Sequence, residues 1–102
     1  MNREELKKII PHREPMLLID EAYVGEDQKA YGSYTVKGDE WFLQGHFPGN
    51  PVVPGVIQCE MAAQTCCVLM QDELLGHIPL FAGMDHVKFK SMVKPGDTIK
   101  FV

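Results

Sequence analysis

A long run of mostly apolar residues in the middle of the chain constrains the fold most. It begins at Pro54, ends near Leu75, and is apolar nearly all round between Val56 and Met70. Pro54 fits the first turn of a helix and Gly76 fits a C-terminal cap, so the run predicts one helix of about 22 residues, roughly 33 Å long. Such a helix must be buried on most sides. In a chain of 102 residues, a sheet wrapped around the helix is the natural way to bury it.

The segments on either side of this helix predict the rest of an α+β domain. A short helix is expected from Asn2 to Ile9, because Asn2 and Glu5 fit a capping box and Pro11 ends the run. Alternating or branched apolar patterns predict strands over residues 16–24, 29–36, 81–90 and 98–102, with turns at 25–28 and 94–97. The first two strands predict an antiparallel hairpin. One face of the second strand carries Ala30, Gly32, Tyr34 and Val36.

Composition and charge exclude several classes of protein. A chain of 102 residues with 45% hydrophobic content fits one small globular domain. The formal net charge of −4 argues against a nucleic-acid-binding protein. The charged N-terminus does not fit a signal peptide, and no uninterrupted apolar run reaches the roughly 18 residues of a membrane span. Cys59, Cys66 and Cys67, odd in number and without a CxxC spacing, are expected to be buried thiols in a reducing compartment, which favours the cytoplasm.

The most specific feature for function is the stretch Gly45 to Pro51, which reads Gly-His-Phe-Pro-Gly-Asn-Pro and precedes the apolar helix. It places the imidazole of His46 in a rigid loop and the carboxyl of Glu60 about one and a half turns into the helix. A neutral imidazole can take a proton, and apolar neighbours favour the protonated carboxyl, which can give one. Gln64 lies one turn beyond Glu60 on the same face and can orient that carboxyl or a water.

Each of these residues also has a plainer interpretation. A single histidine in a turn is usually a polar loop residue, and a glutamate in an apolar helix more often pairs with a buried Arg or Lys. Lys37 is the only Lys or Arg between Ser33 and Val87, which weakens the second alternative. His12 and Arg13 are interpreted as structural residues of the N-terminal segment. No His/Cys cluster has metal-ligand spacing and no glycine-rich loop fits a nucleotide, so neither a metal nor a cofactor is predicted.

Three separated motifs resemble those of 3-hydroxyacyl-[acyl-carrier-protein] dehydratases of the FabZ type. Residues 10–20 read Ile-Pro-His-Arg-Glu-Pro-Met-Leu-Leu-Ile-Asp, similar to that family's N-terminal signature. Residues 45–64, from the Gly-His-Phe-Pro-Gly loop to Ala-Gln, resemble its active-site motif, and residues 84–97 resemble the strand and turn that follow. The motifs keep the family's order and cover essentially the whole chain.

The resemblance implies a single hot-dog dehydratase domain over residues 1–102, truncated at its C-terminus, with an antiparallel sheet wrapped around a long central helix. It implies reversible loss of water from a (3R)-3-hydroxyacyl thioester on acyl carrier protein, giving the trans-2-enoyl thioester in fatty acid elongation. It also implies a homodimer, and a trimer of such dimers, in which His46 of one subunit is the base and Glu60 of the other is the acid. Neither nucleic acid nor membrane is an expected partner.

The helix start and nearby apolar residues supply candidates for holding this substrate. The backbone N–H groups of Gly55 and Val56 lie at the positive end of the helix dipole and can stabilise a developing oxyanion. Phe81, Val87 and Phe89 are candidates to line an apolar tunnel for the acyl chain. The last fifteen residues are basic, and they either meet the acidic carrier protein or simply face solvent. Their lysines are Lys88, Lys90, Lys94 and Lys100.

Three other functions stay open beside the simple dehydratase. The same base and acid would serve an enzyme that also isomerises the enoyl double bond, and tunnel shape would decide between the two. A thioesterase of the same fold fits less well, because the His-Phe-Pro-Gly loop is a dehydratase feature of the family. A non-catalytic subunit that binds acyl thioesters belongs to a different class. It would be expected to lack His46 or Glu60, and both are present.

Overall fold

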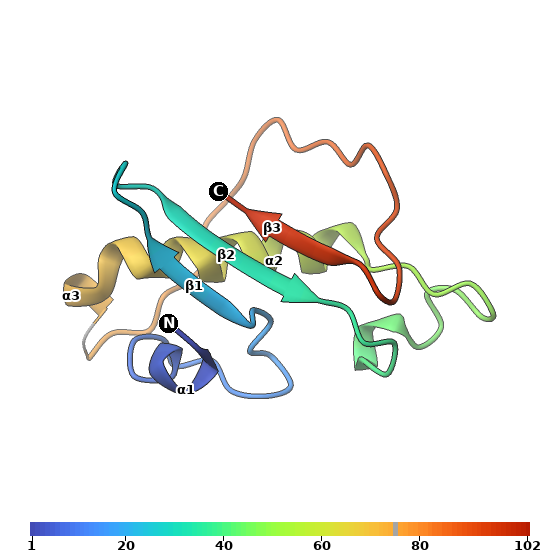
Figure 1. The fold of residues 1–102 in the computed structure, drawn as a ribbon, viewed down its shortest axis with the longest axis horizontal. Coiled ribbons are helices and arrows are strands. Elements are labelled where there is room, and N and C mark those ends of the chain that lie inside the picture. Colours follow the sequence, from blue (N-terminus) through green and yellow to red (C-terminus); the bar gives the residue numbers. More distant parts are fainter. Residues whose placement is uncertain (75) are drawn as a thin grey trace.

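The computed structural model describes residues 1–74 and 76–102, and at its centre a helical run packs on a three-stranded antiparallel sheet (Figure 1). The helical run comprises α2 (Gly55–Cys66), the 3-10 turn η2 (Cys67–Met70) and α3 (Gln71–Leu74). The sheet contains β1 (Glu21–Val24), β2 (Ala30–Thr35) and β3 (Thr98–Phe101), in that order. Two further short helices are α1 (Arg3–Leu6) and η1 (Trp41–Leu43). The predicted α+β class is confirmed.

The central helix occurs where the sequence predicts it, from Gly55 to Leu74. The predicted last residue, Leu75, lies outside the described residues. Gly76 has φ of 76°, the left-handed conformation of a C-terminal cap, and the N–H of His77 donates to the carbonyl of Leu74 at 3.0 Å. Within the described part of the chain, none of the helices has the length and apolar character needed to cross a membrane.

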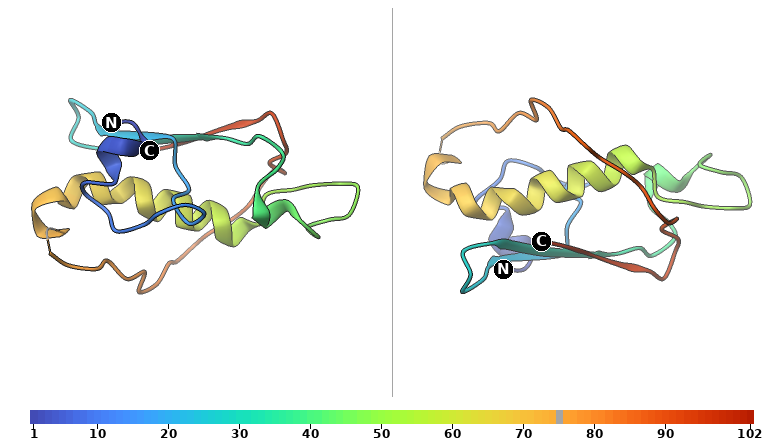
Figure 2. Two further views of the ribbon diagram at one scale, coloured as in Figure 1. Left: turned by 90° about the horizontal axis from the view of Figure 1, so that it is seen from below. Right: turned by 90° about the horizontal axis from the view of Figure 1, so that it is seen from above.

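The sheet lies on one side of the helical run (Figure 2). On that side Met61, Thr65 and Val68 are buried, with 2% or less of each residue exposed. Val56 and Leu69 point elsewhere and are 69% and 48% exposed. Burial of the helix by the sheet is therefore confirmed for one face only.

The predicted hairpin is confirmed and extends into the third strand. β1 pairs with β2 in antiparallel register from Glu21 opposite Ser33 to Val24 opposite Ala30. β2 pairs on its other edge with β3, which follows the predicted turn at residues 94–97. The face of β2 predicted to be apolar is the face that packs on α2. Ala30, Gly32 and Tyr34 on this face, and Val36 directly after the strand, are all buried.

Close packing of β2 against α2 depends on the absence of a side chain at Gly32. A Cβ there would lie 2.7 Å from Cγ2 of Thr65, which is 2% exposed and bonded through its hydroxyl to the carbonyl of Met61. Gly32→Ala is therefore expected to lower the free energy of unfolding by about 1–3 kcal/mol through overpacking. Urea denaturation measures this. Gly83→Ala, where no atom lies within 4 Å, is the control, and equal stabilities for the two variants would contradict the packing described.

The first strand is shorter than predicted, because side chains occupy the backbone groups that a ladder would use. The expected strand covers residues 16–24, and β1 begins only at Glu21. The N–H of Leu18 donates to Oε1 of Gln64 at 2.9 Å. The carbonyls of Leu17 and Ile19 accept from the guanidinium of Arg3 at 2.8 and 3.1 Å. These residues form a buried irregular segment that ties α1 and α2 together.

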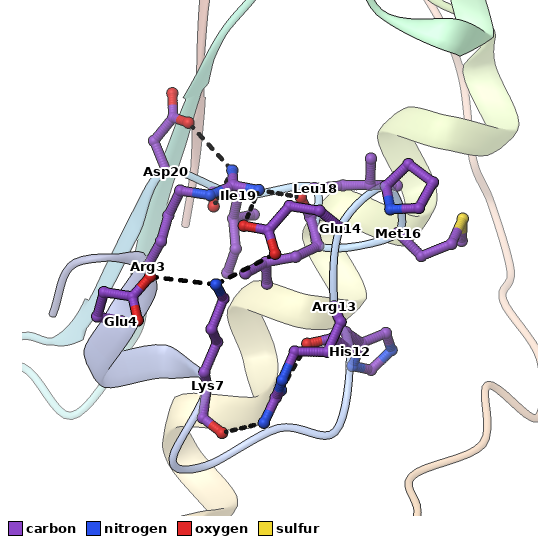
Figure 3. A network of polar contacts seen from close by, with 12 residues as sticks. Arg3, Glu4, Lys7, His12, Arg13, Glu14, Met16, Leu18, Ile19 and Asp20 are labelled. Carbon is purple, nitrogen blue, oxygen red and sulfur yellow. Dashed lines mark hydrogen bonds and ion pairs between the residues drawn. The ribbon is translucent and has the colours of Figure 1, made fainter.

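A network of charges holds the N-terminal segment, which is shown in Figure 3. Glu14 accepts from Arg3 at 3.3 Å and lies 3.1 Å from the ammonium of Lys7. A hydrogen bond from its own backbone, followed by those from Lys7 and Arg3, lowers the pKa of Glu14 to about 2. The predicted capping box of α1 is confirmed, with Asn2 and Glu5 each bonding the other's backbone N–H.

The prediction of a strand over residues 81–90 is wrong. Residues 76–93, here called the crossing segment, run as an irregular extended chain along the side of α2 opposite the sheet (Figure 2). His86 has φ of 56°, in the left-handed region, which a regular strand does not contain. Most of its large apolar side chains line a cavity against α2 rather than packing in a sheet, namely Leu80, Phe81, Met84, Val87 and Phe89.

Candidate active site

Glu60 and Gln64 are in direct contact on α2, as their spacing predicts. Nε2 of Gln64 donates to Oε2 of Glu60 at 2.8 Å and to the carbonyl of Met16 at 2.8 Å. Oε1 of Gln64 accepts from the N–H of Leu18 at 2.9 Å. Because this N–H is a donor, the amide oxygen must face it, and the amide nitrogen must face Glu60. Gln64 is 1% exposed, so its orientation and its role as a donor to Glu60 are fixed.

Glu60 lies at the wall of a mostly apolar cavity of about 630 Å³ between the helical run and the crossing segment. This volume falls within the usual range of small-molecule sites. The helical side is lined by small and sulfur-containing residues, among them Ala63, Cys67 and Met70. The opposite wall includes all three tunnel candidates, Phe81, Val87 and Phe89.

His46 lies in the loop before α2 and is half-buried. Its ring stacks on that of Phe47 with centroids 4.3 Å apart. Nδ1 lies 2.9 Å from the carbonyl oxygen of Val52. Since a carbonyl only accepts, Nδ1 carries the hydrogen, and in the neutral ring Nε2 is then the nitrogen with the lone pair. The backbone carbonyl of His46 also accepts from the N–H of Val52 at 2.8 Å, so the loop fixes the position of the imidazole.

The start of α2 offers the two backbone donors that the sequence predicts. The first helical hydrogen bonds come from the N–H groups of Ile57 and Gln58, which donate to the carbonyl of Pro54 at 3.1 and 3.2 Å. In the described part of the chain, the N–H groups of Gly55 and Val56 have no acceptor, so both can donate to a ligand. The ring of Phe89 covers Gly55 so closely that a Cβ at that position would lie 2.8 Å from it. His46, Gly55 and Phe89 line a second, smaller hollow.

Within one chain, the predicted site residues other than Val56, which is exposed and lines neither hollow, gather in these two hollows. Glu60 and Gln64 share the larger one with the tunnel candidates, and His46 lines the smaller one with Gly55. Phe89 reaches both. His46 and Glu60 therefore line different hollows within a single chain. Among the residues described, no cluster of three or more His, Cys, Asp or Glu is placed to hold a metal ion.

The sequence interpretation missed the position of His12. Its Nε2 lies 3.5 Å from Oε2 of Glu60, and its ring lines the same cavity. The Pro-His-Arg motif marks this residue, but nothing in its spacing shows that it meets a residue in the central helix. Only the irregular path of the chain between α1 and β1, on which Figure 3 shows His12, brings the two together.

The expectation that all three thiols are buried is wrong for Cys66, which is exposed, and Cys59 is only half-buried. Both line the cavity, because the helix face that carries them points away from the sheet. Cys67 is buried as expected. Burial, with smaller effects from Cys66 and Glu60, raises the pKa of its thiol.

Comparison with known proteins identifies dehydratases as relatives of this chain. The family model described as "ApeI dehydratase" matches residues 22–102. The 3-hydroxyacyl-[acyl-carrier-protein] dehydratase FabZ of Clostridium beijerinckii is 47% identical over 104 residues, covering 97% of this chain and 73% of the relative. The FabZ of Caldicellulosiruptor bescii is 48% identical, with 96% and 72% covered. That of Pseudothermotoga lettingae is 42% identical, with 99% and 72% covered.

A match across most of the chain at this identity places it among the dehydratases, which are hydro-lyases. Within that class, the chain belongs to the FabZ family. The family predicted from the three motifs is therefore confirmed, and so is the prediction that the protein is an enzyme.

Proposed function

We propose that this chain catalyses the reversible dehydration of (3R)-3-hydroxyacyl thioesters on acyl carrier protein to trans-2-enoyl thioesters, a step of fatty acid elongation. The observation that carries the proposal is the setting of Glu60, a carboxyl oriented by Gln64 at the wall of an apolar cavity of about 630 Å³. Such a cavity suits an acyl chain, and the carboxyl suits its hydroxyl. The names of the FabZ relatives, which describe those proteins as 3-hydroxyacyl-[acyl-carrier-protein] dehydratases, support it.

Elimination of water needs a base and an acid at neighbouring carbons. Nε2 of His46 takes the proton from C2, next to the thioester carbonyl. The electron pair left at C2 forms the double bond to C3 as the bond from C3 to the hydroxyl oxygen breaks. Glu60, in its acid form, gives its proton to the departing hydroxyl directly or through a water, and water leaves. In the reverse direction the same groups hydrate the enoyl thioester.

The free amides at the start of α2 stabilise the charge that develops on the thioester oxygen. The N–H of Gly55 is the main donor and that of Val56 assists, both at the positive end of the helix dipole. Donors of this kind contribute roughly 3–4 kcal/mol to the transition state in known enzymes. Because Gly55 has no side chain, the thioester can approach its backbone once the ring of Phe89, which covers Gly55, moves aside.

The base and the acid come from two copies of the chain, joined as a homodimer of the hot-dog fold and further as a trimer of dimers. Two observations support the pairing of two copies: His46 and Glu60 line different hollows within one chain, and apolar side chains around them are exposed. The exposed fractions are 54% for Phe47, 69% for Val56 and 55% for Phe89. A two-fold axis that covers these residues would create two equal sites.

The carrier protein delivers the acyl chain to the cavity past the lysines of the crossing segment. Lys88 lines the cavity and Lys90 lines the smaller hollow, and both are exposed, so an acidic partner would be attracted to this side of the molecule.

Hydration of a crotonyl thioester tests the proposal, since loss of the enoyl absorbance reports the reverse reaction. The protein is expected to hydrate crotonyl groups on acyl carrier protein and to give the (3R)-alcohol. Formation of a 3-enoyl product from a longer 2-enoyl substrate would add the isomerase function. Tight binding of the thioester without turnover would instead favour the non-catalytic binding subunit and overturn the proposal.

A further inference from the structure

Two nitrogen atoms approach the same oxygen of Glu60. Nε2 of Gln64 donates to Oε2 at 2.8 Å, and Nε2 of His12 lies 3.5 Å from that oxygen. The second distance is longer than a hydrogen bond in the free protein, and contacts of this kind often tighten when substrate is bound. Both contacts are to Oε2, and within the described part of the chain neither Gln64 nor His12 hydrogen-bonds to Oε1.

The other ring nitrogen of His12 defines its tautomer. Nδ1 is buried and has no hydrogen-bond partner in the described part of the chain. A buried N–H without an acceptor is costly, whereas a bare lone pair costs less. His12 therefore carries its hydrogen on Nε2, the nitrogen that faces Glu60.

The backbone that carries His12 is fixed by the next residue. The guanidinium of Arg13 donates to the carbonyls of Lys7, Ile10 and His12 at 3.0, 3.0 and 2.7 Å (Figure 3). The structural role predicted for Arg13 is thus confirmed. It holds the turn that directs the imidazole toward α2.

We propose that His12 is a positioning residue for Glu60. Its Nε2–H and the amide of Gln64 together hold Oε2 of Glu60 as an acceptor, which leaves Oε1 as the oxygen that carries the proton to and from the substrate hydroxyl. This proposal rests on the proposed function, because it assigns the acid oxygen of that reaction. The other titratable groups lining the cavity are Cys59, Cys66, Cys67 and Lys88, and Gln64 and His12 are the side chains that approach the carboxyl.

Three substitutions at one position separate positioning from simple structure. The side-chain nitrogen of glutamine reaches the place of Nε2 in histidine, whereas that of asparagine reaches the place of Nδ1. His12→Ala and His12→Asn are expected to lower kcat roughly 10–100-fold, the size of effect known for residues that orient metal ligands, with KM little changed. His12→Gln is expected to stay within about threefold of wild type because it keeps an N–H donor at Oε2. His77→Ala, on an exposed histidine, is the control.

The melting temperature is measured for all four variants beside kcat and KM. Equal losses of kcat in His12→Gln and His12→Asn would overturn the proposal. So would losses of kcat that run parallel to losses in melting temperature. A wild-type kcat in all three His12 variants would also overturn it. A separate measurement does not depend on turnover: ¹⁵N NMR of His12 is expected to show a protonated Nε2 and a bare Nδ1. The opposite tautomer would contradict the proposal. An inactive wild-type protein with the expected tautomer would contradict the proposed function and leave the His12–Glu60 geometry supported.

Discussion

His46→Ala is expected to lower kcat/KM for hydration of a crotonyl thioester by about 10²–10⁴-fold, the range for loss of a general base. The loop places the lone pair of Nε2 outward by bonding Nδ1 to the carbonyl of Val52. Alanine removes the base and leaves the backbone bond between His46 and Val52 in place. The enoyl absorbance measures the rate.

The fold is expected to survive this change, because the imidazole is half-buried and lies outside the hydrophobic core. Circular dichroism checks that point, and His77→Ala serves again as the matched control. Residual activity within about threefold of wild type would remove His46 from the chemistry, since a general base contributes far more than that.

Glu60→Gln is expected to cost a similar factor of about 10²–10⁴ in kcat, with little change in KM, because it removes the acidic proton and keeps the shape. The new amide oxygen can still accept from Gln64 in place of Oε2. The variant therefore isolates the acid function from the hydrogen bonding around it. Initial rates over a range of thioester concentrations separate kcat from KM.

Glu73→Gln, on exposed α3, is the matched control for this substitution. A Glu60→Gln variant with wild-type kcat would show that the hydroxyl receives its proton from another group. A variant with unchanged kcat and a much higher KM would instead make Glu60 a binding residue.

Local patterns predicted the elements whose signals lie within a few residues. The capping box of α1, the β1–β2 hairpin and the left-handed Gly76 are confirmed, because capping and turn chemistry are local. The strand over 81–90 failed, because alternation of apolar residues does not show whether they meet a sheet or a cavity. The prediction of a strand also failed for residues 16–20, because Arg3 and Gln64, which are distant in sequence, hydrogen-bond to the backbone there.

The candidate site was predictable where one helix sets the spacing. The contact between Glu60 and Gln64 follows from one helical turn, and the free amide of Gly55 follows from its place at the helix start. His12 was missed because it meets Glu60 only through the fold. The exposure of Cys66 was missed because an apolar helix face can border a cavity as well as a core.

Mixing the two inactive variants tests most directly whether His46 and Glu60 serve one reaction from two copies of the chain. His46→Ala and Glu60→Gln subunits, mixed after mild dissociation and reassociation, create one intact site in every mixed dimer. After random exchange of subunits, half the dimers are mixed, and each mixed dimer has one intact site out of two. The mixture is therefore expected to recover about one quarter of the wild-type hydration rate per total protein. No recovery in a mixture whose exchange is verified by mass spectrometry would contradict a shared site built from His46 and Glu60.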